Sequence, residues 1–195
     1  MQRFMPLTHG DITLRELSKR DNTVLRRLLI EDRDWLVPWE ATTPGIRYPL
    51  DVKGMVRSLI QQARAGSGLA LVIEYQGQVV GQLNVANILY GSVCSGTVGY
   101  WIAKQAAGKS IVPISVAMTI DHLFDQGGLH RVEIDIRPEN EASLRVVQKL
   151  GLRQEGKKER FIHINGAWRD HLVFAVTREE MTGSMLSRVQ NAGKL

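Results

Sequence analysis

The chain has 195 residues, of which 44% are hydrophobic and 23% charged, and a formal net charge of +5 at pH 7. This length and composition allow one domain with a sizeable core and exclude a disordered or fibrous protein. The single cysteine, Cys94, excludes an internal disulfide, and no segment approaches the roughly 20 apolar residues that cross a bilayer. We therefore expect one cytoplasmic domain over residues 1–195, with a core of about 10–177 and a tail of 178–195, and no contact with a membrane.

Strand and helix patterns alternate in the first third of the chain. Asp11–Leu17 alternates polar and apolar residues with a period of two, which predicts a strand, and apolar residues at helical spacing follow Ser18. Residues 34–50 contain three prolines and two tryptophans, which excludes a long regular element. A second helix is predicted from about Asp51 to Ala65, where Gly66 ends it.

Three strands are predicted in the middle of the chain. Residues 69–88 contain two strands around a Gln76-Gly77 turn, and residues 96–103 (GTVGYWIA) form the next strand. Gly96 and Gly99 reduce the side-chain cover of this last strand. Strand glycines of this kind often mark a place where a ligand approaches the backbone closely.

The loop that follows, residues 103–113 (AKQAAGKSIVP), ends like a phosphate-binding P-loop, G-x-x-x-x-G-K-[ST]. Ala103 replaces the first glycine, and Asp135 lies within a charged strand face rather than at the end of an apolar strand, where a nucleotide hydrolase holds magnesium. The loop also fits Q-x-x-G-x-[GA], in which small residues let backbone N–H groups converge on a pyrophosphate without magnesium. We favour this second interpretation and keep the P-loop hydrolase as an alternative.

Helix and strand patterns alternate again after the loop. A helix with one apolar face is followed by residues 129–138 (LHRVEIDIRP), which alternate as a strand. Asn140 is predicted to cap a further helix, and Gly151 to end it.

The end of the core is predicted to be a hairpin. Residues 153–164 and 167–177 flank Asn165-Gly166, a strong turn signal. The basic run at 156–160 (GKKER) is interpreted as an exposed strand edge in preference to an RNA site. The tail predicts a short helix with an apolar side formed by Met181, Met185 and Val189.

The order of these motifs from Gly96 to Thr177 resembles the GCN5-related N-acetyltransferases (GNAT), and within them the RimJ/RimL-like group that acetylates protein N-termini. Residues 137–151 (RPENEASLRVVQKLG) are the most specific segment, and residues 32–41 (DRDWLVPWEA) are similar to the group's substrate-side segment. The resemblance implies an α/β (α+β) fold. It has a mixed, mostly antiparallel sheet of six to seven strands, splayed between its fourth and fifth strands and flanked by about four helices, with acetyl-CoA in the opening.

The resemblance implies which residues hold acetyl-CoA, and it implies no metal. Backbone groups from Tyr100 to Ala103 would contact the pantetheine arm, the loop from Gln105 to Ile111 would wrap the pyrophosphate, and Asn140 would bond near the thioester. Ser110 departs from the usual glycine or alanine of the family. The candidate set is Tyr100, Trp101, Ile102, Ala103, Gln105, Ala106, Ala107, Gly108, Lys109, Ser110, Ile111, Asn140 and Ser143.

Two catalytic candidates follow from the same resemblance. Ser143, one turn after Asn140, would give a proton to the departing thiolate, because Val147 stands where related enzymes keep a tyrosine for this step. Asp135 occupies a position where some members carry an acidic base, with Glu133 or a bound water next in line.

Structural roles stand beside these catalytic ones. Asp135 also fits a cross-strand ion pair, and Ser143 fits a local hydrogen bond in the first turn of a helix. The histidines His130, His163 and His171 lack metal-ligand spacing and are interpreted as structural.

The acceptor is expected to be a primary amine, first of all the N-terminal α-amino group of a protein, with ribosomal proteins among the candidates. Trp35, Trp39 and Glu40 are candidates for the wall that holds this N-terminus, with loop packing as the alternative for the tryptophans. The loops from Trp35 to Tyr48 would select the acceptor. A small amine, an antibiotic, or a non-catalytic role in binding RNA or ribosomes remain alternatives. No direct contact with nucleic acid is expected of the enzyme, which would be a monomer or a homodimer.

Overall fold

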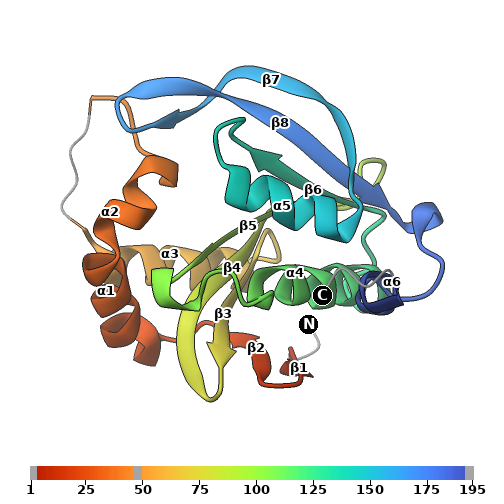
Figure 1. The fold of residues 1–195 in the computed structure, drawn as a ribbon, viewed down its shortest axis with the longest axis horizontal. Coiled ribbons are helices and arrows are strands. Elements are labelled where there is room, and N and C mark those ends of the chain that lie inside the picture. Colours follow the sequence, from red (N-terminus) through yellow and green to blue (C-terminus); the bar gives the residue numbers. More distant parts are fainter. Residues whose placement is uncertain (1–3, 46–49, 192–195) are drawn as a thin grey trace.

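An open sheet of eight strands forms the centre of the computed structural model, which describes residues 4–45 and 50–191 (Figure 1). Its order is β1-β2-β3-β4-β5-β6-β8-β7, and every neighbouring pair is antiparallel except β5 and β6. The strands are β1 (Leu7–His9), β2 (Ile12–Glu16), β3 (Leu69–Tyr75), β4 (Gln78–Leu89), β5 (Ser95–Ile102), β6 (Arg131–Ile136), β7 (Arg153–Ile164) and β8 (Ala167–Thr177). The expected mixed sheet is confirmed, and the short edge strand β1 adds to the strands predicted.

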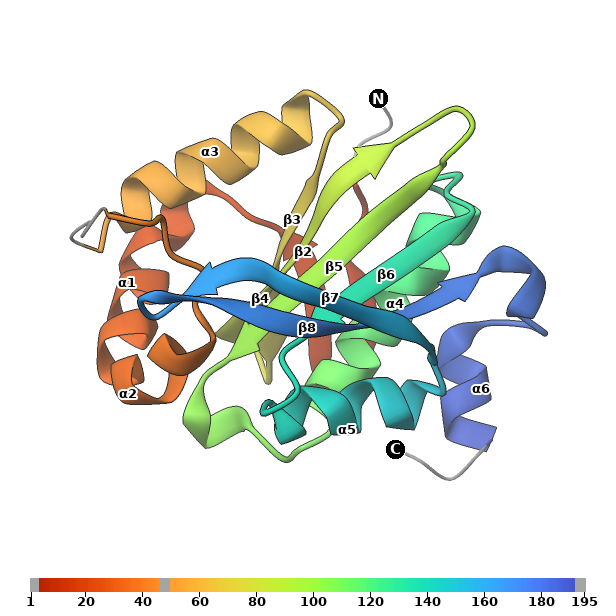
Figure 2. The same ribbon diagram turned by 90° about the horizontal axis from the view of Figure 1, so that it is seen from above.

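Helices cover both faces of this sheet (Figure 2). They are α1 (Asn22–Glu31), α2 (Arg33–Leu36), α3 (Val52–Arg64), α4 (Ile111–Asp125), α5 (Glu141–Leu150) and α6 (Met185–Asn191). The four longer helices, α1, α3, α4 and α5, are those that the sequence predicts. A helix in the tail is confirmed by α6, but it begins at Met185, so Met181 lies outside it. None of the helices in the described part of the chain is long and apolar enough to cross a membrane.

Two hydrophobic clusters hold the layers together. Leu71 and Ile73 of β3 belong to the large cluster built around α4, whereas Ala70 and Val72 belong to the cluster with α1 and α3. Successive side chains of a strand point to opposite faces, so this strand is buried on both sides and reads as a continuous apolar run. The sheet therefore has an α4 face, shared by α5 and α6, and an α3 face, shared by α1 and α2.

Local signals in the sequence set the ends of α5. The side-chain oxygen of Asn140 accepts a hydrogen bond from the Ser143 N–H at 3.1 Å, and Gly151 adopts a left-handed conformation with φ of 67°. These are the N-cap and the C-terminal glycine that the sequence predicts. They place Ser143 one turn into the helix.

The sheet divides between β5 and β6. The two strands pair in parallel only where Ser95, Gly96 and Thr97 meet residues 131–133. The remaining part of β5 has no partner on this side, which is the splay that the resemblance implied. The resemblance implied a splay between the fourth and fifth strands, and in this chain it lies between the fifth and sixth.

The long hairpin β7–β8 extends past the sheet toward the segment after α2 (Figure 1). Its Asn165-Gly166 turn has positive φ angles of 47° and 83°, as a tight hairpin turn requires. Ala41 forms an isolated bridge with Ile164, and the Thr42 N–H donates to the His163 carbonyl at 2.8 Å. The hairpin tip and this segment therefore form one side of the region beyond β6.

Candidate active site

Unpaired backbone donors lie in the loop between β5 and α4. Gly108 and Ser110 both have left-handed backbones, with φ of 78° and 55°. The N–H groups of residues 108–111 have no hydrogen-bond acceptor within the described residues. Successive free N–H groups in such a loop, at the positive end of a helix, form a concave site for an anion. The loop can therefore hold a pyrophosphate without a metal.

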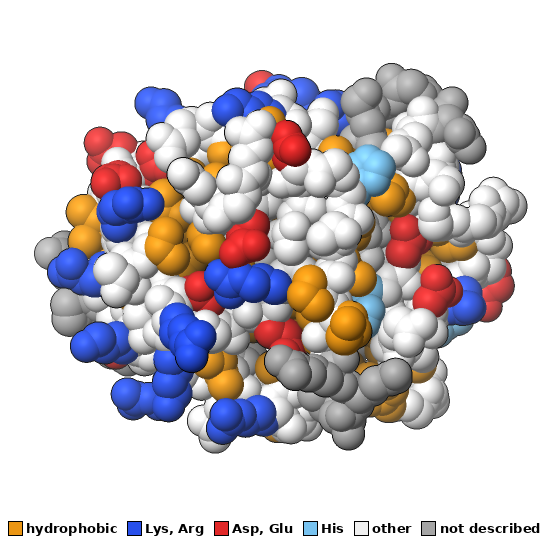
Figure 3. Space-filling view, turned by 90° about the horizontal axis from the view of Figure 1, so that it is seen from below, with side chains coloured by type: hydrophobic (Ala, Val, Ile, Leu, Met, Phe, Trp, Pro, Cys, Tyr) orange, Lys and Arg blue, Asp and Glu red, His pale blue; other side chains and the backbone are white. Residues whose placement is uncertain are grey.

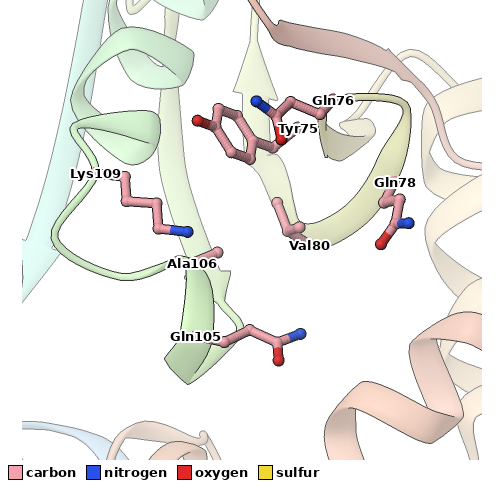
Figure 4. Close-up of a pocket in the computed structure, with 7 residues that line it drawn as sticks. All are labelled: Tyr75, Gln76, Gln78, Val80, Gln105, Ala106 and Lys109. Atoms are coloured by element: carbon pink, nitrogen blue, oxygen red, sulfur yellow. The ribbon is translucent and has the colours of Figure 1, made fainter.

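The side chains of this loop point to different places. Gln105 and Lys109 reach into a pocket of about 250 Å³ beside the β3–β4 turn, and the Lys109 ammonium lies 5.6 Å from the ring centre of Tyr75 (Figure 4). Ala106 is buried. The ammonium of Lys149, on α5, donates to the Ser110 hydroxyl at 3.0 Å. The sequence singled out Lys109 and missed Lys149, because the contact depends on how α5 packs against α4.

Backbone groups of β5 face the opening between β5 and β6. The Ala103 N–H donates to the Val80 carbonyl at 2.8 Å, so residues 101 and 103 turn their backbone groups toward β4. The backbone N–H and C=O groups of Tyr100 and Ile102 point away from β4, toward the opening. The Ile102 carbonyl accepts the indole N–H of Trp35 at 3.1 Å. Of the predicted stretch, the backbone of Tyr100 and the N–H of Ile102 thus remain for a ligand.

The α3 face of β5 is uncovered at Gly99. A Cβ atom built on this glycine would meet no atom within 4 Å. Trp101, two residues further, packs against the cluster of α1 and α3 and donates its indole N–H to Gln82 at 3.3 Å. An acceptor could therefore approach the opening from the α3 face at Gly99.

Polar groups of Tyr100, Asn140 and Ser143 gather on the α4 face of the opening. Asn140 uses its side-chain oxygen to cap α5, which leaves its amide NH₂ for a ligand. The Tyr100 hydroxyl is buried and has no hydrogen-bond partner of good geometry among the described residues. Burial raises the pKa of Tyr100 to about 12, and the neighbouring Ser143 hydroxyl only partly opposes this. The two hydroxyls are therefore neighbours, and Tyr100 stays protonated.

Asp135 lies in an ion-pair network on the opposite face of the sheet. Both of its carboxylate oxygens accept hydrogen bonds from Lys158, at 3.0 and 3.1 Å, and its side chain is only 7% exposed. Burial raises the pKa of Asp135 despite this pairing. The ion-pair interpretation of Asp135 thus describes the free protein, and the partner is Lys158 of β7.

Glu133 is held more tightly than Asp135. It accepts a hydrogen bond from Arg131 at 2.8 Å and is also paired with Lys158. Burial acts to raise the pKa of Glu133, but the hydrogen bonds from Arg131 and Lys158 outweigh it and lower the value. A carboxylate of lowered pKa is a weak proton acceptor, so Glu133 is the poorer candidate base.

His171, for which the sequence favours a structural role, lies beside this group. Its side chain is buried at 3% exposure, and its Nδ1 lies 3.1 Å from the Arg169 carbonyl. A carbonyl oxygen only accepts, so Nδ1 carries the proton and Nε2 keeps a free lone pair. Burial lowers the pKa of His171, which keeps the ring neutral. The register pairs His171 with Lys158, on the face that carries Asp135.

The predicted acceptor wall is only partly free. Trp39 is 36% exposed, and the Arg137 guanidinium lies 5.3 Å from its ring centre. Arg137 also donates to the Pro38 carbonyl at 2.6 Å, which fixes this segment against the end of β6. Trp35 is partly buried, and Glu40 is paired with Arg33. Trp39 is therefore the more exposed of the two tryptophans, and it lies beside Arg137 at the end of β6. Tyr48 lies outside the described residues.

Charge elsewhere on the chain is largely balanced. In the basic run at 156–160, Lys157 contacts Asp170 at 3.0 Å and Lys158 contacts Asp135. This run lies on β7, at the edge of the sheet, as predicted. Figure 3 shows another face, seen from below in the view of Figure 1; Lys and Arg side chains gather on its left half, with acidic side chains among them. No cluster of three or more metal-ligating side chains occurs in residues 4–45 and 50–191.

Comparisons with known proteins show the family of the chain. The family model "Acetyltransferase (GNAT) domain" matches residues 11–153. The [Ribosomal protein uS5]-alanine N-acetyltransferase of Escherichia coli is 26% identical over 179 residues, which are 90% of this chain and 92% of that protein. The probable N-acetyltransferase YjcK of Bacillus subtilis is 33% identical over 99 residues, so the chain spans 55% of that relative's length.

A solved structure resembles the whole domain. Mycobacterium smegmatis RimJ in complex with CoA-disulfide superimposes with a TM-score of 0.87 and 37% identity, covering 94% of this chain and 90% of that one. A RimL structure, titled as a ribosomal L7/L12 α-N-protein acetyltransferase, has a TM-score of 0.77 at 21% identity and shares the fold.

Proposed function

We propose, since the chain belongs to the GNAT acetyltransferase family, that it transfers an acetyl group from acetyl-CoA to the N-terminal α-amino group of a ribosomal protein. The observation that carries the proposal is the opening between β5 and β6. A loop whose N–H groups have no acceptor among the described residues lies at one end of it, and the side chains of Asp135 and His171 lie on the opposite face of the sheet. Cosubstrate and acceptor can thus meet from two sides.

The residues present fit acetyl-CoA. Residues 108–111 would hold the pyrophosphate with backbone N–H groups, and Lys149 would add a positive charge beside them. The free backbone of Tyr100 would bond the pantetheine arm as a strand would, and the Asn140 amide would contact the arm near the thioester. Acetyl-CoA supplies the activated acyl group, and no metal is needed for this binding.

The transfer would be direct, in a ternary complex. The neutral amine attacks the thioester carbon, a C–N bond forms, the C–S bond breaks, and the amine loses one proton. We assign proton removal to Asp135, whose raised pKa suits a base better than that of Glu133. Ser143 would give its proton to the thiolate, and the neighbouring Tyr100 hydroxyl could replace that proton.

Relatives support the choice of acceptor. The Escherichia coli relative is named for the alanine of ribosomal protein uS5, and the RimL structure for ribosomal L7/L12. The partly exposed Trp39 would contact the first residues of such an N-terminus. An enzyme with this acceptor works where ribosomes are made, so we place it in the cytoplasm.

Mass spectrometry of purified ribosomal proteins, incubated with acetyl-CoA and this protein, tests the proposal. We expect one or a few proteins to gain an acetyl group on the N-terminal residue, and none to do so with the Gly108→Val variant. Acetylation confined to small amines or to lysine side chains would contradict the acceptor. Stabilisation by ATP with magnesium, and not by CoA, would contradict the enzyme class.

A further inference from the structure

Arg169 of β8 is a half-buried cation whose side chain has no hydrogen-bond or ion-pair partner among the described residues. Its Nε atom is buried and forms no hydrogen bond, and no carboxylate of the described residues lies within ion-pair distance of its guanidinium. Most buried polar groups in proteins are hydrogen-bonded, and leaving one unpaired costs on the order of 1–3 kcal/mol. The unpaired Nε donor of Arg169 therefore indicates that a hydrogen-bond acceptor of a ligand binds beside it.

The sheet register places Arg169 on the acceptor side. Leu172 pairs with Ile136, the last residue of β6, so Arg169 lies three residues beyond the end of that strand. Alternate residues share a face, so Arg169 lies on the same side as His171 and, across the register, Asp135. The loop that would hold the CoA phosphates starts α4, which packs on the other face. The phosphates of CoA are therefore not the expected partners of Arg169.

Other cations of this region have partners. Lys158 binds Asp135 and Glu133, and Arg137 donates to Glu139 at 3.2 Å. Arg131 is paired with Glu133 and Glu155.

The pKa of Glu139 is lowered, mainly by a backbone hydrogen bond and by Arg137. The positive charge of Arg169 makes a smaller contribution in the same direction. Glu139 is 62% exposed and already bonded to Arg137. This side of the sheet thus keeps one positive charge, that of Arg169, which no carboxylate in the described residues neutralises at ion-pair distance.

We propose that Arg169 binds a side-chain carboxylate of the acceptor, so that the enzyme prefers protein N-termini with Asp or Glu close to the reacting amine. The planar guanidinium can donate two parallel hydrogen bonds to a carboxylate. This inference rests on the proposed function and defines the acceptor class at the same site.

A peptide series measures this preference. The peptides share one N-terminal residue and carry Glu, Gln or Lys at the second, third or fourth position. With wild-type protein we expect kcat/KM to be about tenfold or more higher for Glu than for Gln at one of these positions, the size expected for a hydrogen bond to a charged group. Arg169→Met should remove the preference, and Arg169→Glu should favour Lys at the same position. Arg169→Lys should keep part of it.

Controls separate this site from others. Arg64→Met, on the exposed side of α3, should behave like wild type, and CoA affinity should be unchanged in every variant. If Arg169→Met does not fold, the comparison of Arg169→Lys with wild type still tests the geometry. Equal rates for all peptides, or a preference that survives Arg169→Met, would overturn the role of Arg169. A loss of CoA affinity in the Arg169 variants would also overturn it, because Arg169 would then bind a phosphate of CoA. If wild-type protein acetylates a small amine but none of the peptides, the proposed function falls as well.

Discussion

The ammonium of Lys149 donates a hydrogen bond to the hydroxyl of Ser110 at 3.0 Å, and this contact joins the last turn of α5 to the first turn of α4. Ser110 has a left-handed backbone, and its N–H is one of the N–H groups of residues 108–111 that have no acceptor among the described residues. A positive side chain from one helix thus stands beside the positive end of another. Two sources of positive potential act on the same small volume.

Lys149→Met should weaken CoA binding by about tenfold, because a charge-assisted contact to a phosphate is lost while the apolar stem is kept. Isothermal titration with CoA measures this. Arg145→Met is the matched control, since Arg145 lies on the exposed side of α5 and pairs only with Glu141 at 3.5 Å. An unchanged affinity of Lys149→Met would show that Lys149 serves only to position Ser110.

Gly108→Val should weaken CoA binding more than Lys109→Ala. Gly108 has φ of 78°, a conformation that a β-branched residue adopts only with strain, so the change distorts the run of N–H groups. The Lys109 side chain turns toward Tyr75 and contributes less (Figure 4). The shift in melting temperature with added CoA compares the two variants. Equal losses would mean that the charge of Lys109 holds the phosphates, as in a P-loop.

Acid should weaken the edge of the sheet through Glu155. Arg131 and Arg153 lower the pKa of Glu155 from 4.5 to about 2. A lowered pKa contributes stability that is present above the unfolded value and is lost as pH falls through the folded value. The free energy of unfolding should therefore decrease between pH 4.5 and about 2, and should decrease less in Glu155→Gln. Urea denaturation at several pH values measures both. If the free energy of unfolding decreased equally with falling pH in the wild-type protein and in Glu155→Gln, the prediction would be contradicted.

The regular elements could be predicted because their signals are local. The cap at Asn140, the glycine at 151 and the turn at Asn165-Gly166 each act over a few residues. The partners of the site residues could not be predicted in this way. Strand β7 has irregularities between Gln154 and Gly156 and between Lys158 and Ile162. Each irregularity changes which side chains face inward, so the contact of Lys158 with Asp135 was hidden.

The position of His171 and Arg169 was hidden for the same reason. Both lie on a regular part of β8, but their neighbours come from β6 and from the irregular β7. The sequence does not indicate that they share a face with Asp135, because that depends on how β8 pairs with β6.

Ser143→Ala should lower turnover by about tenfold, because the departing thiolate then takes its proton from water or from Tyr100. A thiol with pKa near 8.5 is already a tolerable leaving group, which keeps the effect small. Steady-state kinetics with an acetyl-CoA analogue of poorer leaving group should enlarge the loss. Tyr100→Phe should cost less than Ser143→Ala and should add nothing to it, if Tyr100 acts through Ser143. Independent losses in the double variant would contradict that arrangement.

Asp135→Asn should lower turnover by about 100-fold near neutral pH if Asp135 removes the proton from the amine. CoA affinity should not change, because Asp135 lies on the face of the sheet away from α4. Raising the pH should rescue the variant, since an N-terminal amine with pKa near 8 then loses its proton unaided. The folded pKa of Asp135 is raised above 3.8, so wild-type turnover should fall as pH decreases through that raised value. The variant His171→Asn distinguishes the two candidate bases, because the unprotonated Nε2 of His171 lies on the same face of the sheet as Asp135. If Asp135→Asn keeps nearly full turnover at pH 7 and His171→Asn loses it, the proton passes to His171, and the pair Asp135–Lys158 serves to hold β7 against β6.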